Sequence, residues 1–248
     1  MTEPDLLGEL HFWIGCGAII AGFTAFAARK GARLHRGAGV LFVISMGLLT
    51  LSGFWLSLAR EIVFTVFLSA ISFHALVTGW AAALGGRIVA RRITQLAPVV
   101  SIALTLGAIV GGVSAANSPS GALNGLPPAA FYGLAGVSAL ISGLDCLYLR
   151  ARAPKPQVRL TRHLWRMGFS FFLAVGIFFF GNNHVLPDAL RHPWTLSAPV
   201  LAVVIWTVFY AVRTRFGPWL RTLRASVPAG RETGRQTRDE TDASSPQT

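Results

Sequence analysis

The sequence predicts an all-α, polytopic membrane protein, folded as one bundle of seven transmembrane helices. The chain of 248 residues is 53% hydrophobic and 13% charged, which is too apolar for a domain that folds in water. Seven runs each approach the roughly 20 apolar residues that a helix needs to cross the hydrocarbon core. Because these runs are apolar on every face, they do not fit the alternating strands of a β-barrel. We expect spans at 10–28, 38–58, 62–84, 95–116, 129–149, 163–181 and 195–212.

Lysine and arginine predict how the bundle is oriented, since these residues accumulate in cytoplasmic loops. With the N-terminus outside, every Lys and Arg except Arg60 and Arg191 falls in a cytoplasmic loop, at a cytoplasmic span end or in the C-terminal tail. We therefore predict an N-terminus outside and a C-terminus inside. The net charge of +12 is explained by this topology and by anionic lipid at the cytoplasmic face, so nucleic acid is not an expected partner. The sequence leaves protein partners open.

Composition along the chain predicts three segments and a location. Residues 1–212 form the transmembrane domain, 213–224 an amphipathic helix on the cytoplasmic leaflet, and 225–248 a disordered polar tail. The acidic N-terminus lacks the positive region of a cleavable signal peptide, so the first span should remain as an anchor. Arginine greatly outnumbers lysine, and alanine and glycine are abundant, which is typical of a GC-rich bacterial genome. We expect a multipass protein of the bacterial inner (plasma) membrane.

Ionisable residues inside spans are costly and are therefore the first candidates for function. Asp145 and Arg166 fall at matched depth in neighbouring spans, which predicts a structural ion pair, with a proton relay as the alternative. His74 lies near the middle of the third span. Its imidazole is expected to bond to a serine or a backbone carbonyl, and the alternative makes it a haem or metal ligand with Met46 as the axial partner.

Two basic motifs lead into spans that start on the cytoplasmic side. "RLHRGAG" (33–39) precedes the second span and "RLTRHLWRMG" (159–168) the sixth, and each places a histidine among arginines. In one interpretation the arginines bind lipid phosphate or pair with Asp145, the histidines hydrogen-bond at the helix starts, and the glycines allow close helix approach. In the other, His35 and His163 are axial ligands of one haem b. Arginines near its propionates would then be Arg33, Arg36, Arg162 and Arg166.

These motifs resemble those of a family of uncharacterised multipass bacterial membrane proteins. The segments that carry the resemblance are "LHFWIG", "ARKGARLHRGAGVLFV" and "RHLWRMGFSFFLAVGIFFFG". Members of the family begin spans with Lys-Gly-x-x-Leu-His-Arg and Arg-His-Leu-Trp-Arg-Met. The resemblance covers most of the membrane region, excludes the tail, and implies membership of a family of unknown function. It also implies an aromatic residue where this chain has His74. The matching positions are His11, Lys30, Gly31, His35, Arg36, Gly37, His163, Trp165, Arg166 and Met167.

The leading functional hypothesis is a non-enzymatic membrane protein whose basic cytoplasmic face engages lipid, a partner or a small anionic ligand. No phosphate-binding loop, metal-binding helix motif or nucleophile elbow is found in the sequence. The alternative is a haem b electron-transfer protein that uses His35 and His163. A small transporter would need discontinuous helices or several charges near the midplane, and His74 alone is predicted there.

Overall fold

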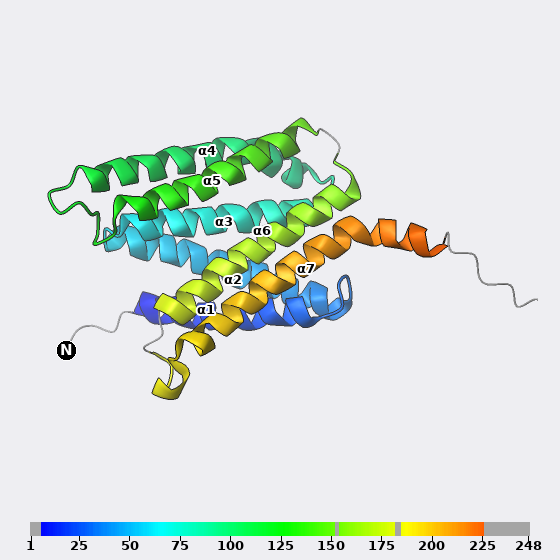
Figure 1. Ribbon diagram of the computed structural model, residues 1–248, viewed down its shortest axis with the longest axis horizontal. Helices are drawn as coiled ribbons and strands as arrows, with labels where there is room; N and C mark the ends of the chain where they lie inside the picture. The colour runs from blue at the N-terminus through cyan, green and yellow to red at the C-terminus, as the bar shows by residue number, and fades with distance from the viewer. Residues whose placement is uncertain (1–5, 152–153, 182–184, 226–248) are drawn as a thin grey trace, which may run out of the picture. The chain divides into compact units, whose positions relative to one another are not determined.

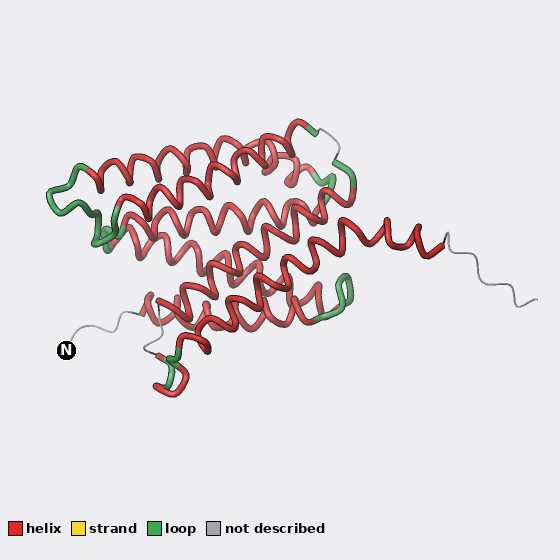
Figure 2. Tube along the Cα trace, in the orientation of Figure 1, coloured by secondary structure: helices red, strands yellow, loops and turns green. Residues whose placement is uncertain are grey.

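A computed structural model of the chain describes residues 6–151, 154–181 and 185–225, with the backbone alone over 215–225. The described residues are helical apart from short connections (Figures 1 and 2). Seven helices are long and apolar enough to cross a membrane, so the predicted all-α, multipass fold class is confirmed. The side of the membrane on which each terminus lies stays a prediction. The membrane-capable helices begin with α1 (Leu6–Ala27), α2 (Arg33–Ala59), α3 (Val63–Leu84), α4 (Ile88–Ala116), α5 (Pro128–Arg150) and α6 (Pro156–Gly176).

The sixth span continues beyond α6 as a π-helix, η1 (Ile177–Gly181), and is followed by a 3-10 turn, η3 (Asp188–Leu190). The seventh helix, α7 (Pro193–Ala225), runs without interruption past residue 212, where the sequence predicted the end of the last span. Residues 213–224, predicted as a separate interfacial helix, continue α7 in helical conformation. The chain divides into two compact units, Met1–Arg215 and Phe216–Thr248. The predicted tail lies outside the described residues from 226 onward.

Three helices begin five to seven residues earlier than hydropathy predicts, and all three begin at the same end of the bundle. α2 begins at Arg33 rather than 38, α4 at Ile88 rather than 95, and α6 at Pro156 rather than 163. Hydropathy finds only the apolar part of a helix, whereas Arg and Lys are good helix formers that extend it beyond the lipid. We name this the basic end, formed by loops 28–32, 85–87 and 151–155, and the other the opposite end, formed by loops 60–62 and 117–127.

Helix α3 lies at the centre of the first compact unit. The α1–α2 pair packs on one side of it and the α4–α5 pair on the other, while α6 packs along α3 and also reaches α1 (Figure 1). The rings of Phe23, Phe26 and Phe42 surround Phe171 of α6 at centroid distances of 5.0, 5.7 and 5.4 Å. Because lipid tails are as apolar as these rings, close packing and polar contacts hold such helices together more than the hydrophobic effect does.

Gly79 allows α3 and α6 to approach closely. A Cβ atom at Gly79 would stand 2.9 Å from the Cβ of Arg166, closer than side chains tolerate. The absence of a side chain at this position therefore lets α6 carry Arg166 into the interior, where it is 0% exposed.

Candidate functional site

A buried carboxylate, Asp145 of α5, is held by three side chains from two other helices. Nε2 of His74 on α3 donates to Oδ2 at 2.8 Å, and Nη2 of Arg162 on α6 donates to Oδ1 at 2.8 Å. Nη2 of Arg166, one helical turn further along α6, also donates to Oδ1. Asp145 is 1% exposed and Arg166 0%, so the centre of the network is buried inside the bundle. We call these four residues the charge cluster.

The charge cluster extends the ion pair expected from sequence. Asp145 and Arg166 do meet, but Arg162 and His74 share the same carboxylate. The predicted partner of His74 was a serine or a backbone carbonyl, and that expectation was wrong because its Nε2 bonds to Asp145. A carboxylate only accepts, so the Nε2 atom of His74 carries a proton. With His74 neutral, two guanidinium groups face one carboxylate, which leaves one positive charge unbalanced.

Aromatic rings cover the two guanidinium groups. The guanidinium carbon of Arg162 lies 4.0 Å from the ring centroid of Tyr148, and that of Arg166 lies 4.3 Å from the ring of Trp165. Such cation–π contacts are favourable where the cation has lost its water. Arg166 is the tenth residue after Pro156, which places it about 15 Å along α6 from the helix start. Arg166 is three residues, about 5 Å, inside the apolar run that begins at 163. The charge cluster therefore lies near the basic end of the span.

His35 and His163 each hold their Nδ1 atom on the backbone carbonyl of another helix. His35 Nδ1 donates to the oxygen of Ala25 and His163 Nδ1 to that of Gly79, both at 3.0 Å. A carbonyl only accepts, so a neutral imidazole in either place carries its proton on Nδ1 and leaves Nε2 as a lone-pair nitrogen. Both rings lie toward the basic end, His35 in the first turn of α2 and His163 beside Gly79 of α3.

The arginines assigned to haem propionates divide into two groups. Arg162 and Arg166 are buried and bound to Asp145, whereas Arg33 and Arg36 are exposed at the basic end. No group of three His, Cys, Asp or Glu side chains placed to hold a metal ion occurs within the part of the chain that the structure describes. Met46, named as an axial partner of His74, packs instead in the core cluster that contains Phe171.

The side chain of Lys30 caps the C-terminal end of α1. Its Nζ donates to the carbonyls of Ala25 and Phe26 at 3.0 and 2.8 Å and lies 4.2 Å from the ring centroid of Tyr210. A cation is favourable here because the last carbonyls of a helix are unpaired and carry partial negative charge. Burial lowers the pKa of Lys30 from its ordinary value. Among the described residues, the exposed cations of this end include Arg29, Arg33, Arg36, Arg87, Arg91, Arg92, Arg150, Lys155 and Arg213.

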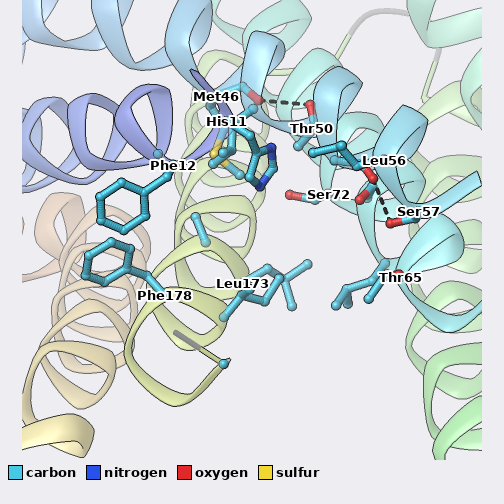
Figure 3. Close-up of a pocket in the computed structure, with 18 of the residues that line it drawn as sticks. His11, Phe12, Met46, Thr50, Leu56, Ser57, Thr65, Ser72, Leu173 and Phe178 are labelled. Atoms are coloured by element: carbon cyan, nitrogen blue, oxygen red, sulfur yellow. Dashed lines mark hydrogen bonds between the residues drawn. The ribbon is translucent and has the colours of Figure 1, made fainter. Parts of the chain in front are cut away.

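The opposite end holds a cavity of about 540 Å³ that sequence reasoning did not predict. Helices α1, α2, α3 and α6 and the π-helix η1 form its walls, and it reaches from Arg60 near the opening to Ser72 in the interior. Figure 3 shows His11 of α1 and Ser72 of α3 facing the same space, with Phe12 and Phe178 beside each other along one wall. Those two rings are stacked at 5.8 Å between centroids. We name this space the His11 cavity.

The proton of His11 can be assigned from its neighbour. The hydroxyl of Ser52 donates to the carbonyl of Leu48 at 2.8 Å, so its oxygen accepts from Nδ1 of His11 at 2.9 Å. The Nε2 atom of neutral His11 is then a lone-pair nitrogen. His11 was a sequence candidate, and the structure places it in the wall of a ligand-sized space.

Gly53 keeps open the point where His11 and Ser69 converge. A Cβ atom at Gly53 would stand 3.1 Å from Cε1 of His11 and 3.2 Å from Oγ of Ser69. Among the described residues the Ser69 hydroxyl has no hydrogen-bond partner, although a serine inside a helix commonly bonds to the preceding turn. The absence of a side chain at Gly53 of α2 therefore leaves a space that His11 of α1 and Ser69 of α3 both border.

A second, more apolar cavity of about 380 Å³ lies among α2, α3 and α4. It shares Thr50 and Ser69 with the His11 cavity, and its lining includes His74 of the charge cluster. The shared residues Thr50 and Ser69 therefore lie between the His11 cavity at the opposite end and His74 of the charge cluster.

Comparison with known proteins adds no assignment to this geometry. The chain matches no protein-family model, no curated protein and no solved structure. The family resemblance carried by the two basic motifs stays a prediction.

Proposed function

We propose that this chain is a membrane-embedded binding protein for a small amphiphile, which has an apolar body and a hydroxyl head and occupies the His11 cavity. The observation that carries the proposal is the convergence of the His11 ring, through its Cε1 atom, and the unpartnered Ser69 hydroxyl beside the Cβ position of Gly53, in a largely apolar space of about 540 Å³. The lone-pair nitrogen Nε2 is bonded to that Cε1 atom, since Nδ1 is occupied by Ser52. Binding sites for small molecules typically have volumes of about 300–1,000 Å³, with apolar walls and a few polar groups that orient the ligand.

The polar groups favour a hydroxyl head over a carbonyl or an amine. The lone pair of Nε2 in neutral His11 accepts a hydrogen bond, so it requires a donor from the ligand. The Ser69 hydroxyl can donate to the same ligand oxygen. Arg60 lines the cavity near its opening and disfavours a cationic head. With a single oxygen, an alcohol or phenol donates to Nε2 of His11 and accepts from the Ser69 hydroxyl, and it carries no positive charge towards Arg60.

The apolar walls suit a ligand that arrives from the bilayer. Phe12 and Phe178 provide stacked rings on one side, and Ile177 and Phe178 belong to a π-helix. Short π-helical segments occur frequently at functional sites. This supports η1 as a wall shaped for the ligand rather than a simple continuation of α6.

The exposed arginines at the basic end support the hypothesis made from sequence that this face engages anionic lipid. Each cation near an anionic membrane surface contributes about 1 kcal/mol of attraction. This face lies at the other end of the bundle from the His11 cavity, so anchoring and ligand binding use different residues. The protein is proposed to be non-enzymatic, to lie in the bacterial inner membrane, and to expose its basic end to the cytoplasm.

Thermal unfolding with paired ligands tests the amphiphile proposal. The purified protein in zwitterionic nanodiscs is titrated with long-chain alcohols and phenols and with their methyl ethers, which keep the body but lose the O–H. We expect a saturable rise in Tm with the hydroxyl compounds and at least a fivefold weaker response to the ethers. Gly53→Leu, which fills the cavity, should abolish the rise.

The control is Gly143→Leu, because Gly143 is an exposed glycine inside α5 with no atom near its Cβ position. This variant should respond as the wild type does. An equal response to alcohols and ethers, or full ligand response in Gly53→Leu, contradicts the proposal.

A haem b electron-transfer protein is the second candidate, and one observation favours it. Both His35 and His163 fix Nδ1 on a backbone carbonyl and leave Nε2 as a lone pair, the arrangement that haem-ligating and metal-ligating histidines use. Two neutral imidazoles from neighbouring helices fit the ligand set of a bis-histidine haem. Arg33 and Arg36 remain as propionate partners, whereas Arg162 and Arg166 are taken by Asp145.

This candidate ranks second because neither cavity described above is lined by His35 or His163. The test is the visible spectrum of protein produced with haem precursor, recorded oxidised and after dithionite reduction. Sharp Soret and α bands that disappear in His35→Ala and in His163→Ala, but persist in His192→Ala, would establish it. Folded wild-type protein without these bands would exclude it.

A further inference from the structure

A second binding site lies within the charge cluster, separate from the His11 cavity. We propose that the guanidinium of Arg166 binds one small monovalent anion of about the size of chloride. The site consists of Arg166 together with Asp145, Arg162 and His74, and it requires no residue of the amphiphile site.

The charge balance of the cluster requires an additional anion. Arginine stays protonated in proteins, and Asp145 stays ionised because two guanidinium groups share it. His74 donates Nε2–H to the carboxylate and is neutral when its other nitrogen is unprotonated. The sum is one positive charge in side chains that are at most 6% exposed. Uncompensated charge is costly in such a place, and one anion removes it.

The hydrogen bonds of Arg166 show where that anion binds. Its Nη2 atom donates to Asp145 and, at 3.4 Å, to the carbonyl of Ile141. The Nε and Nη1 atoms are fully buried and have no hydrogen-bond partner among the described residues. A guanidinium has five N–H groups, so three of them lack an acceptor. The side chain is 0% exposed, so bulk water does not serve these donors.

The Trp165 ring contacts the Arg166 guanidinium but offers its Nε and Nη1 atoms no oxygen or nitrogen acceptor. The guanidinium carbon lies 4.3 Å from the centroid of that ring, which is a cation–π contact. The N–H bonds lie in the guanidinium plane and need acceptors at its edge. A halide accepts several N–H bonds at once and carries the missing charge, whereas a water molecule carries no charge and needs acceptors for its own two O–H groups.

The surroundings limit the anion to a small one. Arg166 lines neither the His11 cavity nor the second cavity, and α3 approaches α6 so closely that the Cβ position of Gly79 is 2.9 Å from that of Arg166. A monatomic anion needs the least room beside such a side chain. Chloride is the natural candidate, and bromide is its measurable substitute.

Bromide bound to the purified protein tests the proposal directly. Wild-type protein in a neutral detergent is equilibrated with bromide, with gluconate keeping the ionic strength constant, and bound bromide is counted by X-ray fluorescence after gel filtration. We expect one bromide per chain at saturation and a Tm that rises saturably with bromide. Less than 0.2 bromide per chain, or a Tm that is the same in bromide and gluconate, overturns the proposal.

Two variants locate the anion. Arg166→Lys keeps the charge but loses the Nε and Nη1 donors, and should weaken bromide binding at least tenfold. Asp145→Asn raises the charge of the cluster from +1 to +2, and should tighten binding about fivefold. Arg191→Lys, at a partly exposed arginine paired with Asp188, is the matched control and should bind as the wild type does.

Full bromide occupancy in Arg166→Lys would place the anion elsewhere and overturn the proposal. If that variant does not fold, the wild-type stoichiometry and the response of Asp145→Asn still decide the question. The alcohol response of the wild type does not depend on this result, so failure of the anion site and failure of the amphiphile site can be told apart.

Discussion

Replacement of Asp145 by asparagine tests how much the charge cluster stabilises the fold. The carboxylate accepts hydrogen bonds from His74, Arg162 and Arg166 and is 1% exposed. Asparagine keeps one acceptor oxygen but removes the negative charge and places an amide donor against these cationic or donating neighbours. Removal of one partner from a buried ion pair typically costs about 3–5 kcal/mol because the remaining charge is left without compensation. We expect a loss of about 3 kcal/mol for Asp145→Asn and about 5 kcal/mol for Asp145→Ala, both within that range.

The assay is equilibrium unfolding by SDS titration in mixed micelles, in gluconate buffer so that bound halide does not mask the loss. The control is Asp188→Asn, because Asp188 pairs with Arg191 at a position where its side chain is 91% exposed. An exposed pair of this kind contributes little, and we expect a change within about 0.5 kcal/mol. A loss below about 1 kcal/mol for Asp145→Asn would refute the reasoning, since typical costs at such buried pairs are several-fold larger.

Three further predictions follow from other contacts. Gly79→Ala should lower the free energy of unfolding in the same SDS titration by about 1–3 kcal/mol, because its Cβ would stand 2.9 Å from that of Arg166. Gly143→Ala has open space around its Cβ and should be neutral or slightly stabilising. Burial lowers the pKa of Lys30 below its ordinary value of 10.5. Between the lowered pKa and 10.5 the unfolded chain therefore binds more protons than the folded chain, so Tm should rise with pH in this window. Lys30→Met should flatten that rise. A C-terminal fusion should be fluorescent with green fluorescent protein and inactive with alkaline phosphatase, and the reverse result would contradict the predicted orientation.

The spans could be predicted from sequence because lipid imposes a simple length and polarity rule on each helix. The same rule failed at the basic end, where α2, α4 and α6 begin five to seven residues before their apolar runs. Arginine-rich first turns are helical without being apolar. His163 is therefore the eighth residue of α6 rather than a residue at its start, and Arg162 is buried rather than at a lipid-facing helix start.

The charge cluster could be predicted only in part. Asp145 and Arg166 are the isolated charges of two consecutive spans, and counting residues from the span ends brings them to one level. The same counting placed His74 near the midplane, apart from Asp145. Their 2.8 Å hydrogen bond depends on how α3 and α5 are offset and tilted relative to each other, and nothing in the sequence of either helix specifies that arrangement.

The His11 cavity could not be predicted because each of its groups comes from a different helix. His11, Gly53 and Ser69 lie in three spans with no shared spacing, and a glycine and a serine are unremarkable in membrane helices. The resemblance to an uncharacterised family did point to His11. Only the packing of α1, α2 and α3 shows that Gly53 leaves the space in which His11 and Ser69 meet.

The central claim is that the His11 cavity holds a hydroxylated amphiphile, and the molecules that accompany the protein out of the membrane test it most directly. Wild-type protein and Gly53→Leu are purified under identical mild conditions, extracted with organic solvent and compared by quantitative mass spectrometry. We predict about one molecule of an alcohol or phenol amphiphile per wild-type chain and less than one tenth of that amount in Gly53→Leu. Equal amounts in both proteins, or a wild-type protein that retains none of this class, would contradict the claim.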